Sequence, residues 1–66
     1  KKNEIIARSI FEIVQISFND EQSQTNYNYL LFYLSIANLF DPHFNEAYYY
    51  SAQIYQFLKN YPILYL

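Results

Sequence analysis

The sequence predicts an all-α fold of antiparallel helices joined by short turns, and three observations lead to this prediction. The chain has no glycine, which disfavours hairpin-rich β architecture because tight hairpin turns need positive φ angles. Apolar residues recur at helical spacing over residues 3–18, 27–40 and 45–59. Polar residues or a proline flank each of these segments. We therefore expect residues 1–66 to form one helical segment; the start at Lys1, without an initiator Met, suggests a piece of a longer chain.

The first predicted helix covers residues 3–18. Glu4 with Arg8, and Arg8 with Glu12, are spaced to form ion pairs along its surface. A strand is the alternative for residues 9–18, where apolar and polar residues also alternate. As a helix, the segment has one apolar stripe that we expect to be buried, made of Ile6, Ile10, Ile13, Val14 and Ser17.

The second predicted helix covers residues 27–40 and follows a polar loop, residues 19–26. Thr25 or Asn26 can accept a hydrogen bond from the first turn and so cap it. The helix contains no charged residue, which suggests contact on two sides. It is shorter than the roughly 20 apolar residues that a membrane span needs, so we predict a buried helix and no membrane span.

Proline marks the joint between the second and third helices. Pro42 disfavours helical φ/ψ at Asp41 and should end the second helix there. Asn45 is expected to cap the third helix, with Glu46 in its first turn, where a negative charge meets the positive end of the helix dipole.

The third helix should continue to Lys59, a cation suited to the C-terminal end. Asn60 can adopt the left-handed conformation that closes a helix. Pro62 then predicts the first turn of a fourth helix, truncated at Leu66.

Composition argues against several classes of function. The net charge is −2 and there are only four Lys or Arg, so nucleic-acid binding is not expected. With no cysteine and one histidine, His43, we expect no metal site. Asp20 and Glu21 lie in a polar loop with nothing to raise a carboxyl pKa, and no nucleophile motif is present. We therefore predict neither enzymatic activity nor a cofactor.

A pattern of small and aromatic residues runs across the Pro42 joint and resembles the tetratricopeptide repeat, a 34-residue helix-turn-helix unit. The resemblance covers roughly residues 28–61 and implies an α-solenoid segment of three helices plus the truncated fourth. The matching positions are Leu30, Leu34 and Ala37 before Pro42, and Tyr48, Ala52, Tyr55 and Tyr61 after it.

Small residues let helices approach closely, so we expect Ala37 and Ala52 at helix contacts, with Tyr48 packing beside them. The three consecutive tyrosines that begin at Tyr48 point in directions about 100° apart on a helix. Tyr50 should therefore lie on a third side, away from both the packing face and the candidate binding face.

The resemblance implies binding residues on a concave face: Glu46, Tyr49, Gln53 and Gln56. Burial of Tyr49 against an adjacent repeat is the alternative. Relatives that clamp a chaperone's C-terminal carboxylate use Lys and Asn where this chain has Tyr49 and Gln53, so a receptor of that kind is disfavoured.

We predict a non-catalytic scaffold for protein–protein interaction that binds a peptide or helix on its concave face. Two alternatives remain. The chain could be a self-contained three-helix bundle that forms a homodimer or other homo-oligomer through exposed aromatic faces. It could also be an accessory domain of an enzyme whose active site lies elsewhere.

Overall fold

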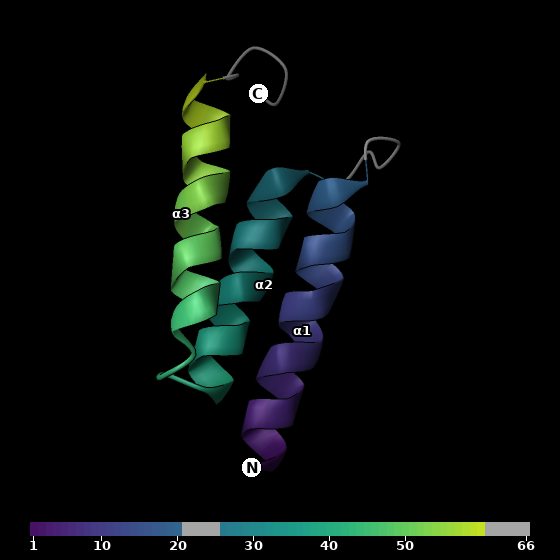
Figure 1. Ribbon diagram of the computed structural model, residues 1–66, viewed down its shortest axis with the longest axis vertical. Helices are drawn as coiled ribbons and strands as arrows, with labels where there is room; N and C mark the ends of the chain where they lie inside the picture. Colours follow the sequence, from purple (N-terminus) through teal and green to yellow (C-terminus); the bar gives the residue numbers. More distant parts are fainter. Residues whose placement is uncertain (21–25, 61–66) are drawn as a thin grey trace.

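The computed structural model describes residues 1–20 and 26–60, which form three α-helices and no strand (Figure 1). The helices are α1 (Lys2–Asn19), α2 (Tyr27–Phe40) and α3 (Asn45–Asn60). In Figure 1, α1 and α3 run in the same direction and α2 runs antiparallel between them. The all-α prediction and the three helical segments are confirmed. The fourth helix expected from Pro62 lies outside the described residues.

The buried face of α1 differs from the predicted stripe. Val14 is buried as expected, and Ile10 and Ser17 are half-buried, but Ile6 and Ile13 are exposed, so that part of the prediction is wrong. The buried stripe is rotated about the helix axis relative to the prediction, because the rings of Phe11 and Phe18 pack against the core. The residues on that side are Ala7, Phe11, Val14 and Phe18, spaced three and four apart.

α2 supplies the centre of the core. Its start is capped as predicted, because the Asn26 side chain accepts a hydrogen bond of 2.9 Å from the backbone N–H of Asn28. Leu30, Leu34 and Ala37 are fully or almost fully buried. These are the three positions that matched the repeat pattern before Pro42, so this half of the pattern lies in the core.

Aromatic rings join α1 directly to α3. The Phe11 ring centre lies 5.0 Å from Phe44 and 5.5 Å from Tyr50, both edge to face. The Phe18 ring centre lies 5.7 Å from Tyr50 and 5.6 Å from Phe57, again edge to face. Such pairs contribute about 0.5–1.5 kcal/mol each beyond the area they bury. This row of rings fills the seam between the two parallel helices.

The packing face of α3 is not the predicted one. Ala52 is exposed and Tyr48 is more than half exposed, so the prediction that these residues pack between helices is wrong. Ala47 and Ile54 are buried instead, and Tyr50, expected on another side, packs against the core. The difference arises because α3 turns its Ala47–Tyr50–Ile54 line, spaced three and four apart, toward the core.

Asn38 closes the joint between α2 and α3. Its side-chain N–H₂ donates to the carbonyl of Asp41 at 3.4 Å and to that of Phe44 at 3.1 Å. α2 ends at Phe40 and Asp41 is extended, as expected before Pro42.

Two end residues were predicted wrongly. Asn45 is the first residue of α3 and not a cap outside it. Asn60 is helical and no described residue has positive φ, so Asn60 does not close the helix in a left-handed conformation.

Candidate interaction surfaces

The four predicted binding residues lie on one exposed strip of α3. Glu46, Tyr49, Gln53 and Gln56 are all exposed, and their spacings of three and four place them on neighbouring turns of one side. Tyr49 is 71% exposed, so no described residue of this chain buries it. We call these four residues the α3 strip.

Arg8 of α1 lies at one end of the α3 strip. A guanidinium nitrogen of Arg8 is 4.0 Å from a carboxylate oxygen of Glu46, and the guanidinium carbon is 4.9 Å from the centre of the Phe44 ring. The predicted pairs of Arg8 with Glu4 and Glu12 are not formed. Because both charged side chains are about 60% exposed, they remain accessible to a ligand, and their ion pair contributes little to stability.

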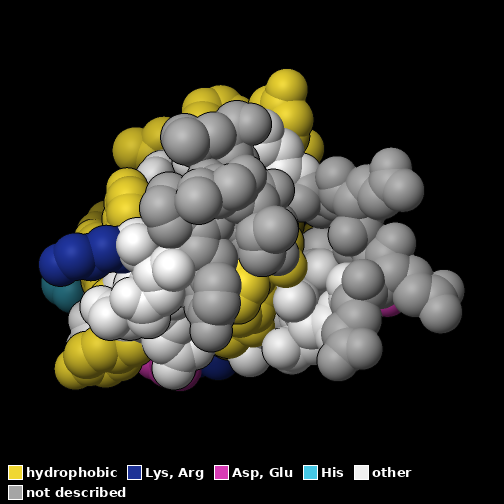
Figure 2. Space-filling view, turned by 90° about the horizontal axis from the view of Figure 1, so that it is seen from above, with side chains coloured by type: hydrophobic (Ala, Val, Ile, Leu, Met, Phe, Trp, Pro, Cys, Tyr) yellow, Lys and Arg dark blue, Asp and Glu magenta, His cyan; other side chains and the backbone are white. Residues whose placement is uncertain are grey.

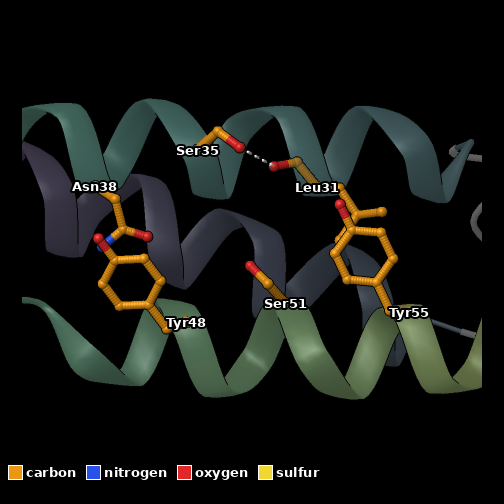
Figure 3. Close-up of a pocket in the computed structure, with 6 residues that line it drawn as sticks. All are labelled: Leu31, Ser35, Asn38, Tyr48, Ser51 and Tyr55. Carbon is orange, nitrogen blue, oxygen red and sulfur yellow. Dashed lines mark hydrogen bonds between the residues drawn. The ribbon is translucent and has the colours of Figure 1, made fainter.

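A cleft of about 320 Å³ opens between α2 and α3 on a different side of α3 (Figure 3). In Figure 3 the ring of Tyr48 points from α3 toward Asn38, and the ring of Tyr55 points toward Leu31. The side chains that line it are uncharged: Leu31, Ser35, Asn38, Tyr48, Ser51 and Tyr55. The hydroxyls of Ser35 and Ser51 donate to backbone carbonyls in their own helices, those of Leu31 and Ala47. The cleft therefore combines two open aromatic rings with groups already partnered.

Large apolar side chains are also exposed on the outer faces of α1 and α2. Figure 2, viewed along the helices, shows hydrophobic side chains reaching the surface on several sides. On α2 the exposed set is Tyr29, Phe32, Tyr33, Leu39 and Phe40, and on α1 it is Ile5, Ile6, Ile13 and Ile16.

The described residues offer little for acid–base or metal chemistry. No group of three or more His, Asp or Glu among them is arranged to hold a metal ion. Burial raises the pKa of the Tyr50 hydroxyl, and a side-chain hydrogen bond with Asn19 partly offsets this increase. Tyr50 belongs to the aromatic row between α1 and α3, and its packing in that row explains the raised pKa of its hydroxyl. Within residues 1–20 and 26–60, none of the helices has the length and apolar character needed to cross a membrane.

Sequence reasoning placed the residues of the α3 strip on a candidate binding face, with burial of Tyr49 as the alternative, but it did not find the cleft or the contacts of Arg8 with Glu46 and Phe44. The sequence did single out Arg8, because it is the only cation between Lys2 and the end of α1. The cleft could not be found, because it depends on how far α3 rotates about its axis. Comparison of the chain with protein-family models, with curated proteins and with solved structures finds no match.

Proposed function

We propose that this chain is a tetratricopeptide-like segment of a helical solenoid and acts as a non-catalytic scaffold for protein–protein interaction. Its repeat pattern is divided between two environments, and this observation carries the proposal. The positions before Pro42 are buried, whereas Tyr48 and Tyr55, the aromatic positions after it, line the open cleft between α2 and α3.

This division is what an array of stacked helices requires. α3 packs against α2 and also, through the aromatic row, against α1. A further helix that repeated this relationship would pack along α2 and α3, where the cleft lies. Solenoid repeats leave such faces open to their neighbours, because each repeat buries its core only by stacking.

The α3 strip is the proposed binding surface. It does not contribute to the cleft, so a further helix in the cleft would leave it free. Tyr49 offers a large area with few rotatable bonds, and the glutamines can each donate and accept hydrogen bonds to a peptide backbone. Arg8 and Glu46 add one charge of each sign at the end of the strip. We propose a peptide or a helix as the ligand.

The test uses peptides selected from a random displayed library against the whole chain. Tyr49→Ala combined with Gln53→Ala should weaken binding of the selected peptides at least ten-fold, while the helical signal in circular dichroism stays unchanged. The matched control is Tyr55→Ala, which removes the same side chain from the cleft and should leave the affinity within two-fold.

Two outcomes would contradict the proposal. If Tyr55→Ala abolished binding and the α3 double variant did not, the cleft would be the binding surface. If selection yielded no peptide whose binding depends on either tyrosine, the scaffold function would be rejected.

A further inference from the structure

The polar side chains of the cleft between α2 and α3 offer a ligand mainly hydrogen-bond acceptors. Ser35 and Ser51 each donate their hydroxyl proton to a carbonyl of their own helix, at 3.1 and 2.8 Å. The N–H₂ group of Asn38 donates to two backbone carbonyls, and the Tyr48 hydroxyl donates to a carbonyl of the joint at 3.5 Å. A hydroxyl oxygen whose proton is engaged can still accept, as can the amide oxygen of asparagine. Among the side chains that line the cleft, Tyr55 alone keeps a hydroxyl proton for a ligand.

The cleft has a polar end and an apolar end (Figure 3). Asn38 and Tyr48 lie together at one end, and Leu31 and Tyr55 lie at the other, with the two serines between them. The two tyrosines are seven positions apart on α3, which is about 10 Å at a rise of about 1.5 Å per residue. Tyr48 is 52% exposed and Tyr55 is 62% exposed, so a ligand can reach both rings.

The polar end is suited to a positively charged group. The face of the Tyr48 ring carries the negative part of the ring quadrupole and attracts cations. The oxygens beside it carry partial negative charge and can accept hydrogen bonds. No Lys, Arg or His is among the side chains that line the cleft, and the whole chain has a net charge of −2. A carboxylate at this end would instead meet acceptors without free donors.

We propose that the helix that covers this cleft inserts an arginine side chain into it. The guanidinium stacks on the Tyr48 ring and donates to the free oxygens of Asn38 and Ser51, because a planar group with five N–H donors can do both at once. The methylene groups of the arginine lie toward Leu31 and Tyr55, at the apolar end. This proposal rests on the proposed function, which places a further helix in the cleft, and it adds the chemistry by which that helix is recognised.

The test uses n-butylguanidinium, which reproduces an arginine side chain, and two probes of similar size, neutral n-butylurea and anionic hexanoate. Each is titrated into the whole chain at about 0.15 M ionic strength, where attraction between exposed charges is partly screened. NMR signals of the Tyr48 ring and the Asn38 side-chain amide should shift with n-butylguanidinium. Its dissociation constant should be at least five-fold lower than those of the other two probes.

Three results would overturn the proposal. The first is binding of n-butylurea or hexanoate as tight as that of n-butylguanidinium. The second is the absence of any shift at Tyr48 and Asn38 up to the solubility of the probe. The third is a set of shifts largest at Glu12 or Glu46, since the cation would then be bound by exposed carboxylates outside the cleft.

Variants of the two tyrosines locate the charged group. Tyr48→Phe keeps the ring and should preserve the preference for n-butylguanidinium over n-butylurea within two-fold, whereas Tyr48→Leu should reduce that preference to less than two-fold. Tyr55→Leu is the matched control, because it makes the same change at the apolar end and should leave the preference unchanged within two-fold. The opposite result for the two leucine variants would overturn the placement of the guanidinium. A failure of the scaffold function would appear in the peptide selection and not in this titration, so the two proposals are tested separately.

Discussion

The guanidinium of Arg8 lies over the ring of Phe44, with its central carbon 4.9 Å from the ring centre. Phe44 immediately precedes α3 and is almost fully buried, and its ring also packs edge to face on Phe11. A residue of α1 therefore covers the joint between the other two helices. This contact, rather than the weak ion pair with Glu46, accounts for the position of Arg8.

Replacing Arg8 should weaken the fold modestly. We expect Arg8→Gln to lower the free energy of unfolding by about 0.5–1 kcal/mol, the usual range for a cation–π contact at an exposed site. Glu46→Gln should cost less, because it removes only a surface ion pair. Urea denaturation of both variants measures the difference. Equal losses would mean that the ion pair, and not the ring contact, holds Arg8 in place.

The two alanines of α3 allow a matched test of the packing face. Ala47 is fully buried and Ala52 is exposed. Ala47→Leu should destabilise the chain by about 1–3 kcal/mol, because the core has no room for the added carbons. Ala52→Leu makes the same change on the same helix and should stay within about 0.5 kcal/mol. Thermal unfolding measures the stability of both variants. A larger loss for Ala52→Leu than for Ala47→Leu would mean that Ala52 lies on the packing face, as the sequence predicted.

The Asn38 side chain should contribute strongly to the stability of the joint between α2 and α3. Its two hydrogen bonds satisfy carbonyls on both sides of Pro42. Asn38→Ala should cost about 1–3 kcal/mol, since it removes two hydrogen bonds of about 0.5–1.5 kcal/mol each, while each carbonyl keeps a backbone donor, the N–H of Phe44 or of Ala47. The control is Ser35→Ala, which removes one exposed hydrogen bond within α2. Urea denaturation gives both values, and a loss for Asn38→Ala no greater than that of the control would show that water replaces the donor.

Alkaline pH should unfold the chain partly through Tyr50. Burial raises the pKa of its hydroxyl in the folded state, so the folded chain holds this proton more tightly than the unfolded chain does. The stabilisation is complete below the unfolded pKa of about 10 and is lost as pH rises through the folded pKa. Tyr50→Phe should make stability fall less steeply between about pH 9 and 11.

The control for this pH dependence is Tyr49→Phe, at an exposed position outside the aromatic row. Stability is measured by urea denaturation at each pH. If Tyr50→Phe and Tyr49→Phe gave the same slope, the burial of Tyr50 would not contribute to alkaline unfolding.

Local signals in the sequence were sufficient for the three helices and for the limits of α2, but not for the end residues Asn45 and Asn60 of α3. The polar segment that ends at Asn26, with its capping side chain, and the Pro42 joint placed α2 to the residue. The apolar spacing of Leu30, Leu34 and Ala37 identified the central core, because α2 has neighbours on two sides and most rotations bury these positions. For the α3 strip, the same spacing placed four polar or aromatic residues on one side of a helix.

Which face of α1 and α3 is buried was decided only by the tertiary structure. Both helices carry apolar residues on more than one side, so periodicity alone leaves their rotation undetermined. The edge-to-face contacts of Phe11 and Phe18 with Tyr50 determine that rotation, because large rings gain more by packing together than isoleucines gain at the same place. As a result, several isoleucines of α1 are exposed, as are Tyr48 and Tyr55 of α3, and a cleft opens between α2 and α3. The sequence by itself determined three helices and their joints; packing of aromatic rings between distant segments decided which surfaces remain open for binding.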